Sequence, residues 1–126
     1  MSNKILIVDD AAFMRLMLKD ILTSADFTGI IEAKSGNEAM MQVRLERPHV
    51  VILDVTMPDM DGIEALDKIK AFSEDTAVIM CSSMGQETIV ETCFEHGADD
   101  FVMKPFKPER IIQAVSKFVT PQQNAE

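Results

Sequence analysis

Short apolar runs recur at regular intervals along this chain and are separated by amphipathic segments. The runs occupy residues 4–8, 30–33, 49–53, 77–81 and 100–103. Residues 49–53 read His-Val-Val-Ile-Leu. A run of β-branched and aliphatic residues without polar alternation is typical of a strand buried on both faces of a parallel sheet. The pattern therefore predicts five short strands of this buried kind.

The segments between these runs carry apolar residues at the three- and four-residue spacing of helices. The predicted helices span residues 12–24, 36–46, 62–72, 85–96 and 108–119. Gly97 is expected to end the fourth helix, and Pro108 suits the first turn of the last one. Five strand–helix units in strict alternation predict an α/β fold.

In such a fold the five strands form a single-domain, doubly wound parallel sheet with helices on both faces and right-handed crossovers. A chain of 126 residues, 47% of them apolar, suits one domain with its own core. We expect residues 1–120 to form this domain and residues 121–126 to be a polar C-terminal tail.

The chain is acidic, with a formal net charge of −9. This charge argues against non-specific binding to nucleic acid, which requires a basic face, and against binding to an anionic membrane surface. The acidic pairs Glu74-Asp75 and Asp99-Asp100 are expected to lie in solvated turns. No apolar stretch approaches the roughly 18 residues of a membrane span, and the N-terminus lacks the features of a signal peptide. We therefore expect a soluble cytoplasmic protein.

Carboxylates follow two of the predicted strands directly. Asp9 and Asp10 come after the first strand, and Asp54 comes after the third. In a doubly wound sheet the loops after these strands lie side by side at the topological switch point, so the three carboxylates should converge. Hard anionic oxygens in a cluster suit a small divalent cation, best Mg²⁺. The alternative is that Asp9 or Asp10 caps the helix that begins near Ala12.

Two more polar residues end strands at the same edge. Ser82 follows the fourth strand and Lys104 follows the fifth. A carboxylate nucleophile, a divalent cation, a hydroxyl and an ammonium together form a cradle for a phosphoryl group. Taken singly, Ser82 could instead cap the helix predicted to begin near Gly85, and Lys104 could be a solvated charge.

This set of residues resembles the receiver domain of bacterial two-component response regulators. The resemblance covers about residues 3–119 and includes Met57-Pro58 and Asp61-Gly62 after the central aspartate. It implies a flavodoxin-like fold with strand order 2-1-3-4-5, the order that the chemotaxis receiver CheY exemplifies.

The resemblance implies a role for each matching residue. Asp54 would accept a phosphoryl group from the phosphohistidine of a sensor kinase. Asp9, Asp10, Asp54 and the backbone carbonyl of Thr56 would hold Mg²⁺, and Lys104 would pair with the phosphoryl oxygens. The chain would catalyse only its own phosphorylation and dephosphorylation, and so would be a signalling switch rather than an enzyme.

The resemblance also implies how the switch works. Ser82 would move toward the phosphoryl group, and Phe101, at the family's switch-aromatic position, would rotate from exposed to buried. The Lys104–Pro105 bond would be cis, which costs little before proline. The output face would comprise the fourth helix, the fifth strand and the fifth helix, roughly residues 85–96 and 101–116.

Among stand-alone receivers, residues 7–15 and 81–86 look most like chemotaxis regulators of the CheY type. That similarity implies a chemotaxis kinase, the flagellar motor switch protein and a dedicated phosphatase as partners. The alternative is a phosphorelay intermediate that passes its phosphoryl group to a histidine phosphotransfer protein. A phosphatase of the haloacid-dehalogenase type is disfavoured because position 56 is Thr where that family needs a second Asp.

Overall fold

A computed structural model of the chain describes residues 3–121. This part of the chain contains one parallel sheet of five strands in the order β2-β1-β3-β4-β5. The strands are β1 (Ile5–Val8), β2 (Ile30–Ala33), β3 (Val50–Asp54), β4 (Ala77–Ser82) and β5 (Asp100–Met103). The predicted α/β fold, with a doubly wound sheet in the order 2-1-3-4-5, is confirmed.

The three central strands are buried along their whole length, as expected for strands covered by helices on both sides. Their register places the ends of β1 and β3 side by side, because Val8 pairs with Leu53. Asp54 in turn pairs with Cys81, one residue before the end of β4. The carboxyl ends of neighbouring strands therefore lie at one edge of the sheet.

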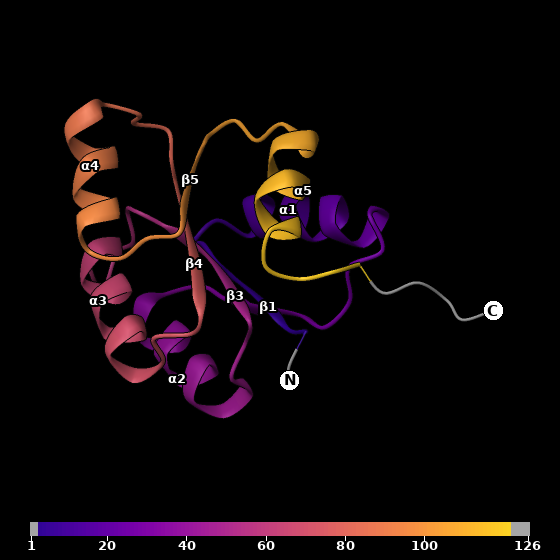
Figure 1. Cartoon of the computed structure of the whole chain (residues 1–126), viewed down its shortest axis with the longest axis horizontal. Coiled ribbons are helices and arrows are strands. Elements are labelled where there is room, and N and C mark those ends of the chain that lie inside the picture. Colours follow the sequence, from indigo (N-terminus) through magenta and orange to yellow (C-terminus); the bar gives the residue numbers. More distant parts are fainter. Residues whose placement is uncertain (1–2, 122–126) are drawn as a thin grey trace.

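Helices cover both faces of the sheet in two separate layers (Figure 1). The helices are α1 (Ala12–Ser24), α2 (Gly36–Glu46), α3 (Gly62–Phe72), α4 (Glu87–Glu95) and α5 (Pro108–Ser116). One apolar cluster packs α2, α3 and α4 against the sheet, and a second packs α1 and α5 against its other face. Within residues 3–121, no helix is long and apolar enough to cross a membrane.

Three predicted helix ends differ from the structure, one of them being the end of α4, which lies at Glu95 rather than at residue 96. Helix α4 begins at Glu87 rather than at residue 85, because Gln86 is an extended N-cap residue. The side chain of Met103 occupies the space beside Gly85, whose added Cβ would lie 2.2 Å from the Met103 sulfur. Helix α5 ends at Ser116 rather than at residue 119, and Val119 closes a final turn through its N–H to the Val115 carbonyl. Most of the predicted tail, residues 122–126, lies outside the described residues.

The expectation of a solvated turn is wrong for Asp100, whereas Asp99 lies exposed in a bend, as expected. Asp100 begins β5 and is buried, and its carboxylate accepts hydrogen bonds from Arg110 Nη2 at 2.8 Å and from Lys117 Nζ at 2.9 Å. Asp99 accepts a bond of 2.8 Å from the Val78 amide. Both carboxylates therefore have structural roles. Asp100 joins β5 to α5, and Asp99 extends the pairing of β5 with β4.

Candidate functional site

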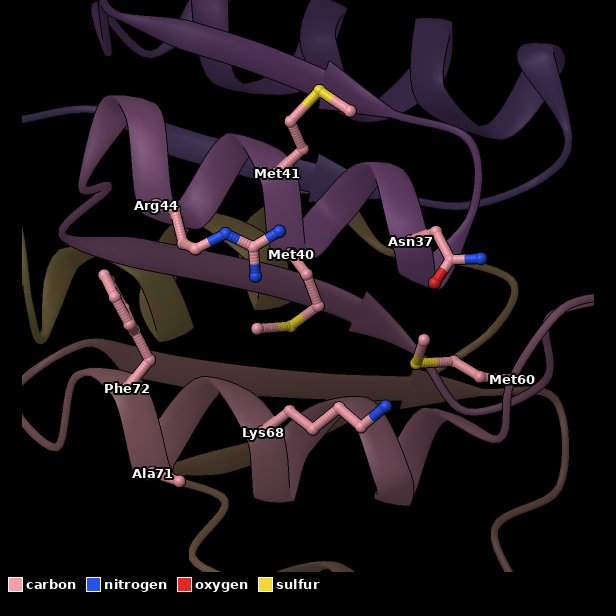
Figure 2. Close-up of a pocket in the computed structure, with 8 residues that line it drawn as sticks. All are labelled: Asn37, Met40, Met41, Arg44, Met60, Lys68, Ala71 and Phe72. Atoms are coloured by element: carbon pink, nitrogen blue, oxygen red, sulfur yellow. The ribbon is translucent and has the colours of Figure 1, made fainter.

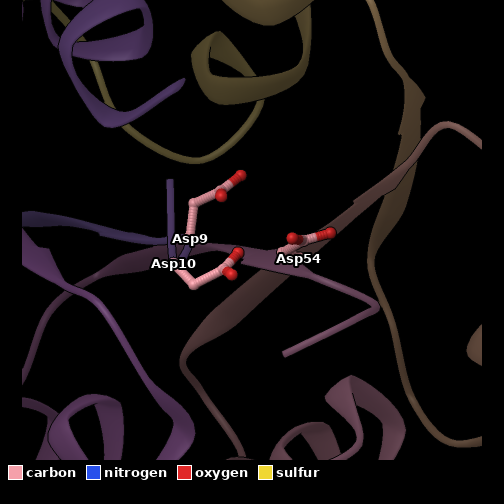
Figure 3. Close-up of side chains that lie close together, drawn as sticks. All are labelled: Asp9, Asp10 and Asp54. Atoms are coloured by element: carbon pink, nitrogen blue, oxygen red, sulfur yellow. The ribbon is translucent and has the colours of Figure 1, made fainter. Parts of the chain in front are cut away.

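The three predicted carboxylates do converge at the switch point (Figure 3). Asp9, Asp10 and Asp54 each offer an oxygen within 4.8 Å of the others. Asp9 and Asp54 are buried, whereas Asp10 is exposed. This geometry follows from the register of β1 and β3, which brings the residues after Val8 beside Asp54.

Lys104 provides a positive charge among these carboxylates. Its ammonium lies 2.9 Å from Asp9 Oδ2 and 3.3 Å from Asp54 Oδ2, with only 17% of the lysine side chain exposed. Although burial opposes the charged form, the hydrogen bond to Asp9 and the charge of Asp54 raise the pKa of Lys104. The lysine is thus held as an ammonium, and the possibility that it is a solvated charge at a strand end is excluded.

The electrostatics of Asp54 differ from those of an ordinary surface carboxylate. Burial raises its pKa, Lys104 opposes that change, and the nearby Asp9 adds to it. The Thr56 amide also lies 3.4 Å from Asp54 Oδ1 and helps to lower the pKa. A buried carboxylate beside a second carboxylate is stabilised by an additional cation. Bonding to an electrophile, over which its negative charge spreads, stabilises it as well.

Asp9 does not cap helix α1. Its Oδ1 accepts a hydrogen bond of 2.9 Å from the Ala11 amide, one residue before the helix begins. Ala11 is the N-cap residue, and its side chain makes no capping bond. The second oxygen of Asp9 faces Lys104, so the carboxylate is oriented toward the site rather than toward the helix.

Ser82 is the last residue of β4 and is buried at the same edge. Its hydroxyl oxygen accepts a hydrogen bond of 2.9 Å from the Met84 amide, so it orders the β4–α4 loop and does not cap α4. The Ser82 carbonyl accepts a bond of 2.9 Å from the Lys104 amide. The backbones that carry the hydroxyl and the ammonium are therefore joined directly.

Two other expectations concern β5 and the residues that follow it. The Lys104–Pro105 peptide bond is cis, as predicted. Phe101 lies in the core cluster with only 9% of its surface exposed. The aromatic side chain is therefore buried in this structure, and its rotation on switching stays a prediction. Thr56, whose carbonyl was predicted to be a metal ligand, lies exposed in the loop after β3.

Sequence reasoning missed two residues that support the site. Arg15 Nη1 donates a bond of 2.8 Å to the Asp9 carbonyl, and its Nε donates to Glu32 at 3.0 Å. Asp59, in the β3–α3 loop, accepts bonds of 2.9 Å from the amides of Gly36 and Asn37 at the start of α2. The amides of Asn37 and Gly36 lower the pKa of Asp59. No local sequence signal marks either residue, because the Arg15 bonds join positions 6 and 17 residues apart and the Asp59 bonds join positions 22 and 23 residues apart.

The profile of the response regulator receiver domain matches residues 5–116. The chain belongs to the response regulator receiver family. Among curated relatives of this receiver, the chemotaxis protein CheY of Bacillus subtilis is 46% identical over 117 residues, which cover 93% of this chain and 98% of the relative. CheY of Thermotoga maritima is 44% identical over 117 residues, with the same coverage of 93% and 98%.

Solved structures agree with this assignment. The receiver resembles a chain of the CheX-CheY-BeF3-Mg complex from Borrelia burgdorferi with a TM-score of 0.87 and 38% identity, over 90% of this chain and 87% of the other. It resembles chemotaxis protein CheY4 of Vibrio cholerae with a TM-score of 0.87 and 27% identity, over 94% and 100% of the two chains. The receiver is therefore of the CheY type, a signalling switch of two-component systems rather than a conventional enzyme.

Proposed function

We propose that this receiver is a stand-alone response regulator that accepts a phosphoryl group on Asp54. The observation that carries the proposal is the position of the Asp54 carboxylate, which is buried, lies 3.3 Å from the Lys104 ammonium and shares its edge of the sheet with Asp9 and Asp10. An anionic nucleophile beside a fixed cation is the arrangement that phosphoryl transfer needs.

The acidic cluster fits Mg²⁺, a hard cation that prefers oxygen ligands and retains several waters. Asp9, Asp10, Asp54 and the carbonyl of Thr56 would hold the ion. When bound, it would neutralise charge on the transferring phosphoryl oxygens. One solved neighbour of this receiver is a CheY complex whose name includes BeF3 and Mg, which supports the same choice.

The transfer step follows from the residues at the site. An oxygen of Asp54 attacks the phosphorus of a kinase phosphohistidine as the bond from phosphorus to the histidine nitrogen breaks. The histidine departs with the electron pair of that bond, and an acyl phosphate forms on Asp54. Lys104 pairs with the phosphoryl oxygens, and the Ser82 hydroxyl donates a further hydrogen bond to them.

Switching would begin with the hydroxyl of Ser82. To reach the phosphoryl group, its oxygen leaves the Met84 amide and draws the β4–α4 loop toward the site. Converting a mostly inactive population to a mostly active one requires about 5 kcal/mol of differential interaction. New hydrogen bonds to a charged group, at about 1.5–3 kcal/mol each, are sufficient. The face formed by α4, β5 and α5, with Phe101, would then present the altered surface.

The partners in this proposal are a chemotaxis sensor kinase as phosphoryl donor and the flagellar motor switch protein as target. The high identity to CheY proteins over nearly the full length of those relatives supports the chemotaxis assignment. The CheX of the Borrelia complex indicates a further class of partner for the phosphorylated form. Transfer onward to a histidine phosphotransfer protein would identify a relay instead.

The proposal is tested by incubating the full chain with acetyl phosphate and Mg²⁺ and measuring its intact mass. We expect the wild type to gain one phosphoryl group and Asp54→Asn to gain none. Asp75→Asn, which changes an exposed carboxylate in a turn, is the matched control and should be labelled like the wild type. Labelling of Asp54→Asn at the wild-type rate would remove Asp54 from this role.

A further inference from the structure

A groove runs between α2 and α3 on the face of the sheet that these helices cover (Figure 2). Its volume is about 670 Å³, within the usual range for binding sites. Its lining comes from α2, from the β3–α3 loop and from α3: Asn37, Met40, Met41, Arg44, Met60, Lys68, Ala71 and Phe72. None of the proposed phosphoryl-transfer residues lines it.

The groove is rich in flexible apolar side chains. Met40, Met41 and Met60 contribute to its lining, and Phe72 stands at one end. Met41 is 53% exposed and Phe72 is 41% exposed, and the neighbouring Leu45 on α2 is 71% exposed. Methionine side chains adapt to an incoming apolar surface, and exposed groups of large apolar residues mark sites of interaction.

The charges of the groove are opposite to the charge of the chain. Arg44 projects from α2 and Lys68 from α3, so each wall carries one cation, and no acidic residue is among the lining residues. Lys68 forms an exposed ion pair with Glu64, at 3.2 Å on the same helix. Arg47 lies with its guanidinium 5.2 Å from the centre of the Phe72 ring and adds a third cation near that end. A groove with cationic walls on a chain of net charge −9 is complementary to an acidic ligand.

We propose that this groove docks an acidic amphipathic helix of a partner protein. The apolar residues of that helix, at positions i, i+3 or i+4 and i+7, would lie against the methionines, and its flanking carboxylates would pair with Arg44 and Lys68. Helix-in-groove binding suits a site with two helical walls and an apolar base.

This surface is separate from the α4–β5–α5 face but is connected to the acceptor site. Met60 closes one end of the groove and belongs to the same β3–α3 loop that begins after Asp54. The preceding residue, Asp59, holds the first amides of α2. A helix docked in the groove therefore contacts the loop of the acceptor site while the α4–β5–α5 face stays free for another partner.

The probe is a synthetic helix of about 18 residues, long enough to be partly helical in water, with leucines on one face and glutamates beside them. It is titrated into the ¹⁵N-labelled full chain without a phosphodonor, so the result does not depend on the role of Asp54. We expect saturable shifts of the amides of Met41, Met60 and Phe72. The same peptide with lysine in place of glutamate is expected to cause none.

Charge reversal in the groove provides the decisive comparison. We expect Arg44→Glu and Lys68→Glu each to weaken peptide binding by about fivefold. Each variant loses one exposed ion pair with the peptide and puts repulsion between two carboxylates in its place. Lys107→Glu changes the net charge equally, but Lys107 is the N-cap residue of α5, which packs on the other face of the sheet, and the change should leave the affinity unchanged. Thermal unfolding of each variant checks that the fold is retained.

Three results would overturn the proposal. The first is the absence of a saturable shift at the highest soluble peptide concentration. The second is equal binding of the lysine peptide, which would show that the cations play no part. The third is a shift centred on Phe101 and Met103 together with weakening by Lys107→Glu, which would place the helix on the α4–β5–α5 face.

Discussion

The ammonium of Lys104 lies 2.9 Å from Asp9 Oδ2 although the two residues are 95 positions apart in the chain. The strands that precede them, β5 and β1, are not neighbours in the sheet. The long lysine side chain spans this separation and also reaches Asp54 at 3.3 Å. One cation therefore links the carboxylates of two different strands, in the position where we propose that a phosphoryl group is held.

Removal of this cation should destabilise the protein. Lys104→Met leaves Asp9 and Asp54 buried without their counter-ion, and we expect a loss of about 3 kcal/mol at pH 7. The loss should shrink at low pH, where Asp54, whose pKa is raised by burial, is protonated, and urea unfolding at pH 7 and pH 3 measures both values. Lys104→Arg keeps the charge and should retain more stability than Lys104→Met. Equal stability of Lys104→Met and the wild type at pH 7 would contradict the assigned pairing.

Replacing Asp54 by a neutral residue should stabilise the protein, in contrast to the removal of Lys104. Because the pKa of Asp54 is raised by burial, the folded protein binds its proton more tightly than the unfolded chain does. Its contribution to stability is thus present at low pH and is lost as the pH rises above the ordinary value of 3.8. We expect Asp54→Asn to be more stable than the wild type at pH 7 in a chelator, and equally stable near the acid limit.

The response to Mg²⁺ provides a separate measurement on the same pair of proteins. At ten times its dissociation constant, the ion should stabilise the wild type by about 1.4 kcal/mol. Asp54→Asn lacks one anionic oxygen donor and should gain less. Asp75→Asn, outside the cluster, should respond like the wild type. An identical gain for the wild type and Asp54→Asn would place the ion elsewhere.

The same substitution at two glycines near the site should have effects of different size. A Cβ on Gly62 would lie 2.4 Å from the Asp54 carbonyl oxygen and 2.6 Å from Val55 Cα, which are backbone atoms. A Cβ on Gly85 would meet the Met103 sulfur, at the flexible end of a side chain. We expect Gly62→Ala to cost about 2–3 kcal/mol of unfolding free energy and to slow labelling of Asp54, whereas Gly85→Ala should cost under about 1 kcal/mol.

Denaturant unfolding of the two glycine variants, with phosphoryl labelling as a second readout, tests this contrast. Met103→Ala combined with Gly85→Ala should relieve the remaining crowding at Gly85. A larger loss of stability for Gly85→Ala than for Gly62→Ala would show that the loop after β4, not the one after β3, is the more rigid.

The Asp100 cluster should contribute pH-dependent stability. Burial alone would raise the pKa of Asp100, yet the donors Arg110 and Lys117 lower it overall. A carboxyl with a lowered pKa stabilises the fold above its unfolded value near 3.8, and that contribution is lost as the pH falls. Asp100→Asn should therefore cost about 1.5 kcal/mol at pH 7 and almost nothing at pH 2, as measured by urea unfolding. A cost that is independent of pH would assign the effect to packing instead.

The sheet, its helices and the residues gathered at the site could be predicted from the amino-acid sequence. Strands buried on both faces must be continuous apolar runs, so Asp9, Asp54, Ser82 and Lys104 stand out where those runs end. Parallel strands bring their carboxyl ends to one edge, which is why their convergence could be predicted from chain position alone. The strand order came from the family resemblance, and the structure agrees with it.

The contacts that join distant segments depend on the folded arrangement and could not be predicted from the sequence. Asp100 reads as a turn residue, but α5 folds back to place Arg110 and Lys117 against it. Met103 from β5 packs beside Gly85 in the β4–α4 loop, and Asp59 from the β3–α3 loop supports the start of α2. A polar side chain looks the same in sequence whether it faces water or a partner across the fold. Its environment is set by which helices pack together, and that is a property of the assembled chain rather than of any local pattern.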